Sequence, residues 1–236
     1  MASNKLASKH GLDVIYEDNH LLVINKKAGD LVHPSSTTKD SLDVAAKNYL
    51  KEKLNKPGKV YLGVVHRIDR PTSGVLVFTR TSKAAARLSK LFQDKEVTKT
   101  YWAIVEQKPP TNSGTLHHYI KKNEDKKISM VSNVPKKDYK DAVLHYNTIG
   151  HSNKSFLLEI NLETGRYHQI RAQFAHMEFP VQGDLRYGFP KSNADASISL
   201  HARSIEFMHP VRNEIIKIEA PLPKNPIWKN MEGIIK

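Results

Sequence analysis

The stretch H-R-I-D-R-P-T-S-G at residues 66–74 contains the residue types best suited to chemistry. Asp69 lies between Arg67 and Arg70, and nearby cations favour the ionised form of a carboxylate. An ionised carboxylate is the form that acts as a nucleophile. The small residues at 72–74 would let a nucleotide approach closely. Taken alone, the same residues also fit a surface aspartate in a solvated ion pair, which is a common and weak interaction.

Two further segments contain candidate residues. Tyr101 begins a predicted strand, where its phenol could stack on a base or exchange a proton, or simply belong to the core. In E-T-G-R-Y-H-Q-I-R-A-Q-F-A at residues 163–175, Arg166 and Arg171 flank a predicted helix start, which is a natural place for phosphate contacts. Arg171 lies off the apolar stripe of that helix and could pair with a carboxylate elsewhere. The alternative is an amphipathic helix with solvated arginines.

Hydrophobic periodicity predicts the elements that position these residues. Strands are expected at residues 61–65 and 74–79, so that two strands hold the ends of the charged loop. Upstream, two short strands are expected within residues 12–25, followed by a helix over 41–54. Downstream, a helix is expected over 82–94, with Ser82 as its N-cap.

The remainder of the chain is predicted to be mainly strands. They are expected at 99–105, 114–120, 127–132, 142–149, 156–162, 204–208 and 214–219, with a helix over 168–176. The Pro-rich run A-P-L-P-K-N-P is expected to end the regular structure. Strands outnumber helices and crossover-length helices are few, which favours an α+β fold with a mixed, mostly antiparallel sheet and flanking helices. With no shift in composition, we expect a flexible tail at residues 1–10 and one domain over 11–236.

Composition limits the classes of partner. The chain has 236 residues, with 37 lysines and arginines against 24 acids, a formal net charge of +13. Such an excess attracts polyanions, so nucleic acid is the first partner to consider, although a basic enzyme without one is an alternative. A membrane partner is not expected, because no long basic amphipathic helix is predicted. The absence of signal-peptide and membrane-spanning patterns predicts a cytoplasmic protein.

A metal or thiol site is not expected either. The chain has no cysteine, which excludes disulfides, zinc–thiolate sites and iron–sulfur clusters. His117 and His118 are neighbours on a predicted strand, so their side chains should point to opposite faces and cannot share one metal.

Taken together, these segments resemble the RluA-type pseudouridine synthases. The resemblance rests on ordered blocks that span nearly the whole chain: L-D-V-I-Y-E-D-N-H-L-L-V-I-N-K, H-R-I-D-R-P-T-S-G-V-L-V-F-T-R, V-T-K-T-Y-W-A-I-V, L-E-T-G-R-Y-H-Q-I-R-A-Q-F-A-H, F-P-V-Q-G-D-L-R-Y-G and L-H-A-R-S-I-E-F-M-H-P. Each block is weak by itself, whereas their order and spacing make the resemblance specific.

The resemblance implies an enzyme that isomerises selected uridines in RNA, with the fold of that family and a central cleft. Asp69 matches the catalytic aspartate, Tyr101 the active-site tyrosine that stacks on the target base, and Arg171 the basic residue that pairs with the aspartate. Arg67 matches a position that can fill the space left by a flipped base. The residues expected to contact RNA are Arg67, Arg70, Thr72, Arg166, His168, Lys83 and Arg87.

Two departures from the family pattern stand out. The family usually has Lys-Pro-Ala-Gly after the second strand, whereas this chain has K-K-A-G at residues 26–29. Losing the proline is expected to loosen that loop without touching a catalytic role. An N-terminal S4 domain, common among relatives, is not expected here, so RNA recognition should come from the catalytic domain's own surface. We further expect a monomer. No cofactor or metal is expected, because an isomerisation needs no redox change.

Several alternatives stay open at this point. A noncatalytic RNA-binding or ribosome-assembly factor with the same fold is one, although Asp69, Tyr101 and Arg171 are all present. A base-removing hydrolase that uses the same aspartate is another. Within the isomerase hypothesis, Asp69 attacks C1′ of the ribose or C6 of the base, or assists elimination to a glycal. The RNA is ribosomal RNA or transfer RNA.

Overall fold

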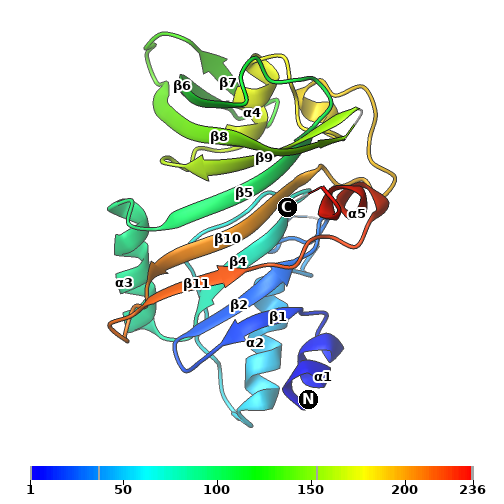
Figure 1. Cartoon of the computed structure of the whole chain (residues 1–236). Helices are drawn as coiled ribbons and strands as arrows, with labels where there is room; N and C mark the ends of the chain where they lie inside the picture. Colours follow the sequence, from blue (N-terminus) through cyan, green and yellow to red (C-terminus); the bar gives the residue numbers. More distant parts are fainter. Residues whose placement is uncertain (1, 37, 153, 235–236) are drawn as a thin grey trace. The chain divides into compact units, whose positions relative to one another are not determined.

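The computed structural model describes residues 2–36, 38–152 and 154–234 (Figure 1). Where the sequence predicts one domain, the contacts divide the chain into two compact units. Unit 1 comprises Met1–Val97 and Ala202–Pro221, and unit 2 comprises Thr98–His201 and Leu222–Lys236. Both mix strands with a few helices, as expected for an α+β fold. No helix in the described ranges is long and apolar enough to cross a membrane.

The sheet of unit 1 has the strand order β1-β2-β4-β10-β11, with β3 paired to β4. The pairs β1–β2, β2–β4, β3–β4 and β10–β11 are antiparallel. Its strands are β1 (Val14–Glu17), β2 (Leu21–Lys26), β3 (Gly63–Val64), β4 (Ser73–Thr79), β10 (Leu200–Met208, which enters unit 1 at Ala202) and β11 (Ile215–Glu219). The predicted charged loop therefore does run between two paired strands, β3 and β4.

Both faces of β2 are covered, which explains its uninterrupted apolar sequence. Leu22 and Ile24 belong to a core cluster with α2 (Leu42–Lys53) and α1 (Ala2–Lys9). Leu21 and Val23 belong to a second cluster, with Leu88 of α3 (Ser82–Gln93).

The prediction of a flexible tail at residues 1–10 is corrected, because Ala2–Lys9 form helix α1. Ala7 is buried in the α2 cluster, and Lys9 donates to Glu52 of α2 at 2.7 Å. The Lys9–Glu52 contact joins residues 43 positions apart along the chain, so local composition could not reveal it.

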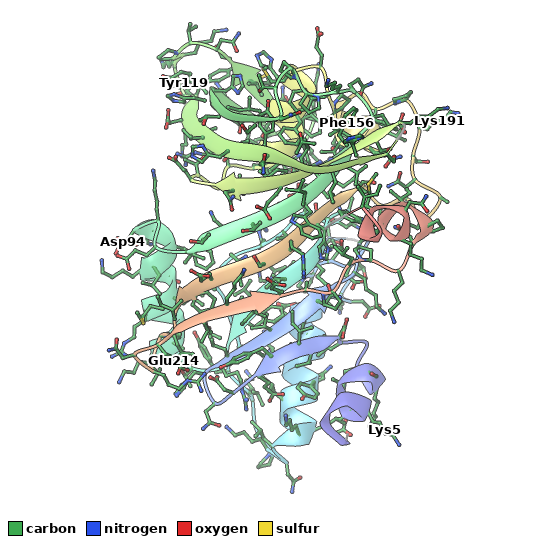
Figure 2. All side chains as sticks on the ribbon, viewed as in Figure 1. Lys5, Asp94, Tyr119, Phe156, Lys191 and Glu214 are labelled. Atoms are coloured by element: carbon green, nitrogen blue, oxygen red, sulfur yellow. The ribbon has the colours of Figure 1, made fainter. Side chains whose placement is uncertain are left out.

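The N-cap of helix α3 lies one residue earlier than the Ser82 predicted from the sequence. The N-cap is Thr81, whose hydroxyl accepts a hydrogen bond from the amide of Ala84 at 3.2 Å. Ser82 is the first helical residue. Both side chains can cap a helix, and the extended backbone at Thr81 decides between them. At the other end, Asp94 is the C-cap (Figure 2).

The sheet of unit 2 has the order β5-β9-β8-β6-β7, with antiparallel neighbours. Its strands are β5 (Thr98–Val105), β6 (Ser113–Asn123), β7 (Ile128–Ser132), β8 (Lys140–Ser152) and β9 (Ser155–Leu162). Helix α4 (Gln169–His176) packs Ile170 and Phe174 into the core of this sheet, followed by a short 3-10 turn, η1 (Leu185–Tyr187).

The prediction that regular structure ends at A-P-L-P-K-N-P is wrong, because helix α5 (Pro226–Glu232) begins at the last proline of this run. Asn225 caps this helix by accepting from the amide of Trp228 at 3.1 Å, and Pro226 occupies the first helical position. Proline suits that position because its φ is already helical and its missing N–H needs no partner there. Trp228 is buried against Ile104 and Leu157.

Candidate active site

The loop between β3 and β4 holds the half-buried Asp69 in a tight turn. The carbonyl of Asp69 accepts a hydrogen bond from the amide of Thr72 at 3.0 Å. At the start of the loop, the imidazole Nε2 of His66 accepts from the amide of Val77 at 2.9 Å, and its ring stacks on Phe92. The loop is therefore fixed to β4 and α3 of the same unit.

The small residues at the end of this loop serve packing. Gly74 has a φ of +114°, and a Cβ there would lie 2.2 Å from the carbonyl oxygen of Ala202 on β10. Only glycine fits such a conformation and such an approach. Thr72 is 1% exposed and packs inside the loop, and its expected contact with RNA stays a prediction. Ser73 is buried as well.

Lys26 is a buried residue beside the Asp69 loop that the sequence analysis missed. It ends β2, is 1% exposed, and its ammonium donates to three carbonyl oxygens: those of Lys27 at 2.9 Å, Arg70 at 3.0 Å and Thr72 at 2.9 Å. Two of these carbonyls belong to the residues that follow Asp69. A lysine at the end of an uninterrupted apolar strand was the available signal, because burying a charge requires partners for it.

The three hydrogen bonds from the Lys26 ammonium form the Lys26 clamp. The neighbouring backbone adds two more bonds to the same loop. The amide of Gly29 donates to the carbonyl of Arg70 at 2.8 Å, and Nε of Arg70 donates back to the carbonyl of Gly29 at 2.9 Å. The K-K-A-G segment therefore supports the Asp69 loop directly. A proline at position 27 would keep the carbonyl that Lys26 uses, so the departure from the family pattern leaves the clamp intact.

Burial lowers the pKa of Lys26 to about 8, although the nearby carboxylates of Asp30 and Asp69 act in the opposite direction. An ammonium has three N–H donors, which matches the three carbonyls. The neutral amine has only two donors and leaves one carbonyl without its bond. The clamp is therefore complete while Lys26 carries its charge.

The other expected RNA contacts in unit 1 lie at the surface. Arg67, Arg70, Lys83 and Arg87 are all exposed. Arg67 and Arg70 flank Asp69 on its loop, whereas Lys83 and Arg87 belong to α3. One guanidinium nitrogen of Arg87 also donates to the carbonyl of Pro210 at 2.8 Å.

Arg171 in unit 2 makes a buried, two-point ion pair. Its Nε and Nη2 atoms donate to the two carboxylate oxygens of Asp184 at 2.7 and 2.9 Å, and the side chains are only 4% and 1% exposed. The guanidinium carbon lies 5.0 Å from the centre of the Tyr187 ring. The solvated arginine considered from the sequence is therefore excluded here, and Asp184 is a carboxylate partner that the sequence analysis did not name.

His168 packs beside the Arg171–Asp184 pair as an uncharged side chain. Its backbone is left-handed at the N-cap of α4, its ring stacks on Tyr167 at 3.8 Å, and it is buried. Burial, together with Arg171, Arg186 and Lys122, lowers the pKa of His168 to about 3, so the ring is neutral. His168 is therefore a neutral, buried side chain, and its expected contact with RNA stays a prediction.

Tyr187 is held from both sides. Its hydroxyl accepts from the amide of Ser129 at 2.7 Å and lies 3.0 Å from Nδ1 of His168. Burial raises the pKa of Tyr187 to about 12, so the phenol keeps its proton. The phenol and Nδ1 of the neutral imidazole thus share one hydrogen bond, and the tautomer of His168 sets which of them donates.

Two more predicted residues lie in unit 2. Tyr101 is half-buried on β5 and packs against the main core of the unit. Arg166 precedes α4, and its Nε donates to the carbonyl of Asp141 at 2.7 Å. The structure thus gathers Arg166, His168 and Arg171 around the start of α4. Asp69 belongs to unit 1, so its joint action with the residues of unit 2 is a proposal.

Within the part of the chain that the structure describes, no three His, Asp or Glu side chains are arranged to hold a metal ion. The opposite orientation predicted for the paired histidines is confirmed. His117 is exposed and lies 2.6 Å from Asp141, whereas His118 is buried next to Gln173.

Comparison with known sequences gives consistent matches. The sequence model of the family described as RNA pseudouridylate synthase matches residues 20–176. The ribosomal large subunit pseudouridine synthase D of Xylella fastidiosa is 36% identical over 228 residues, covering 91% of this chain and 67% of the relative. The uncharacterized RNA pseudouridine synthase YlyB of Bacillus subtilis is 34% identical over 225 residues, covering 95% and 73%.

Solved structures agree on the fold. The human RNA pseudouridylate synthase domain containing 4 superposes with a TM-score of 0.78 at 23% identity, covering 94% of this chain and 93% of that one. The human domain containing 1 gives a TM-score of 0.70 at 22% identity, with 92% and 85% covered.

Proposed function

The chain belongs to the RNA pseudouridylate synthase family, and from that membership we propose a specific mode of action for it. It is an isomerase that forms pseudouridine in RNA. We propose that it acts on selected uridines of structured RNA, with Asp69 as the nucleophile. The observation that carries the proposal is the Asp69 loop itself, whose carbonyls at Arg70 and Thr72 are tied down by one buried ammonium.

The reaction breaks the N1–C1′ bond of uridine and rejoins the base through C5. A uridine stacked inside folded RNA must first be flipped out, which costs a few kcal/mol. Asp69 then attacks C1′ or C6, or assists elimination to a glycal. In each case the proton on C5 leaves and N1 gains one, so that substrate and product have the same atoms.

Three other residues have proposed roles. Tyr101 stacks on the target base and assists proton transfer, since a half-buried phenol offers both a ring face and a hydroxyl. Arg171 pairs with Asp69 and orients it. Arg67, two residues before Asp69 and exposed, fills the space left by the flipped base.

The RNA is proposed from relatives and from charge. Several relatives are named as synthases of the large ribosomal subunit, so ribosomal RNA is the first substrate to test and transfer RNA the second. The net charge of +13 and the exposed Arg67, Arg70, Lys83 and Arg87 favour a polyanion. We propose that the protein binds RNA as a cytoplasmic monomer without cofactor.

The test is conversion of unmodified large-subunit ribosomal RNA and transfer RNA by the purified chain, with pseudouridine mapped at single-nucleotide resolution. Asp69→Asn is nearly isosteric but has no anionic oxygen, so we expect product to fall to background while RNA binding persists. Substantial turnover by Asp69→Asn would overturn the nucleophile. Release of free uracil would instead indicate a base-removing hydrolase, and binding without any product a noncatalytic RNA-binding protein.

A further inference from the structure

Asp184 is an acid whose side chain has almost no contact with solvent. It is 1% exposed, and a carboxylate this deeply buried keeps its charge only when a cation and hydrogen bonds compensate it. Both of its oxygens meet the same guanidinium, at 2.7 and 2.9 Å. The proposed mechanism assigns a role to Arg171 and none to Asp184.

The backbone around Asp184 is fixed independently of Arg171. The carbonyl of Asp184 accepts from the amides of Tyr187 at 3.0 Å and Phe189 at 3.1 Å, and its own amide donates to Val181 at 3.1 Å. The preceding Gly183 has a φ of +84°, and a Cβ there would lie 2.6 Å from the side-chain amide of Asn193. This loop is therefore a rigid base for the carboxylate.

The guanidinium is constrained in two directions at once. Asp184 holds the edge formed by Nε and Nη2, and the ring of Tyr187 lies 5.0 Å from the guanidinium carbon. Tyr187 is itself fixed through Ser129 and His168. Because a guanidinium is rigid and planar, fixing one edge also fixes where the Nη1 edge points.

We propose that Asp184 is a positioning residue, which fixes the plane and direction of Arg171 so that the Nη1 edge can receive the catalytic carboxylate. Tyr187 supports the same guanidinium from beside it. The inference rests on the proposed role of Arg171 toward Asp69. It assigns Asp184 no contact with RNA, so it predicts a loss of rate without a loss of binding.

The experiment is a double-mutant cycle on the single-turnover rate, with the RNA that the wild-type enzyme converts. We expect Asp184→Asn to lower the rate by about 100-fold, because a displacement of about 1 Å in a positioning group has an effect of that size. Binding of the same RNA should change by less than about twofold, since phosphate contacts supply most of it. Arg171→Lys has no fork to align, so adding Asp184→Asn to it should lower the rate little further.

A matched control and a second readout make the result specific. Asp195→Asn is the same substitution in the same unit, at an exposed residue bonded to Ser197 and Asn225, and it should keep the wild-type rate. In the ¹⁵N spectrum, the Nε–H of Arg171 should exchange slowly with solvent in the wild type and rapidly in Asp184→Asn. If Asp184→Asn does not fold, Asp184→Glu keeps the charge and displaces the fork, and should lower the rate with unchanged binding.

Two results would overturn the inference. One is a folded Asp184→Asn enzyme with the wild-type rate, and the other is a cycle in which the two substitutions multiply independently. Failure of the proposed function would look different, because wild-type enzyme would then form no pseudouridine or Asp69→Asn would remain active. The slow exchange of the Arg171 Nε–H tests the pairing of Arg171 with Asp184 even in that case.

Discussion

The ammonium of Lys26 lies 3.0 Å from the carbonyl oxygen of Arg70, 44 residues further along the chain. Arg70 directly follows Asp69, so the end of β2 supports the loop that carries the proposed nucleophile. The bond to Thr72 extends the support across that turn. Because the donor is a single buried charge, the geometry of the loop depends on the protonation state of one amine.

Lys26→Met should destabilise the protein and slow it. The substitution keeps an apolar stem of similar length but leaves buried carbonyls without a donor, at about 1–3 kcal/mol for each group that finds no other partner. We expect a loss of at least about 2 kcal/mol in the free energy of unfolding, measured with urea. Lys27→Met is the control, because its side chain is exposed and its carbonyl is retained. An unchanged unfolding free energy for Lys26→Met would contradict the clamp.

The pKa of Lys26 gives a signature in alkaline solution. The value is about 8 in the folded protein against 10.5 for an ordinary lysine, so between these limits the unfolded chain binds more protons. The contribution of Lys26 to the free energy of unfolding should therefore rise with pH from about 8 to 10.5, by about 3 kcal/mol in total. Subtracting the pH profile of Lys26→Met from that of the wild type isolates this group.

The catalytic rate should fall as the pH rises over this range, whereas the contribution of Lys26 to stability rises. Deprotonation leaves the amine with two donors for three carbonyls, so we expect the single-turnover rate to fall as the pH rises through about 8. The same measurement on Lys26→Met should lack this alkaline limb. A limb of equal size in both proteins would assign it to another group.

Arg171→Ala should be costly for the fold as well as for the reaction. Removing the guanidinium leaves Asp184 buried and unpaired, which typically costs about 3–5 kcal/mol. Arg171→Lys keeps the charge without the fork and should lose less. Urea unfolding measures both, with Arg166→Ala as the control. Among the described residues, the side chain of Arg166 bonds a main-chain carbonyl and no carboxylate, and it is less buried. Equal stability of Arg171→Ala and wild type would show that the pair contributes nothing.

Tyr101→Phe separates stacking from proton transfer. The variant keeps the aromatic ring and removes only the hydroxyl, so RNA should bind with nearly the wild-type dissociation constant. If the phenol transfers a proton, the single-turnover rate should fall by about 100-fold or more. A wild-type rate would restrict the role of Tyr101 to stacking.

The exposed cations of α3 should contribute to the salt dependence of RNA binding. Log affinity falls as log salt concentration rises, and each phosphate contact makes that slope steeper by about 0.7–0.9. Lys83→Ala should therefore reduce the slope by about that amount, and Arg87→Ala by the same or less, because Arg87 also bonds Pro210. Lys5→Ala on α1 is the control (Figure 2) and should leave the slope unchanged. Binding that ignores salt would contradict the electrostatic surface.

The sequence by itself determined the elements whose signals are local. The apolar run of β4 predicted a buried strand, and the spacing in α2 and α3 predicted helices, because periodicity reflects the burial of one face or both. The ordered motifs also determined the family, and with it Asp69, Tyr101 and Arg171 as candidates. These conclusions need only residues that are close together in the chain or blocks in a fixed order.

Tertiary structure decided which charged and polar residues are buried and what they contact. Lys26 meets carbonyls 44 and 46 residues away, and Asp184 meets Arg171 across 13 residues and a turn. The packing around His168 and Thr72 likewise decided that both are buried and that His168 is neutral. The free energy of burying a polar group depends on the partners that the fold brings to it, and local sequence does not specify those partners.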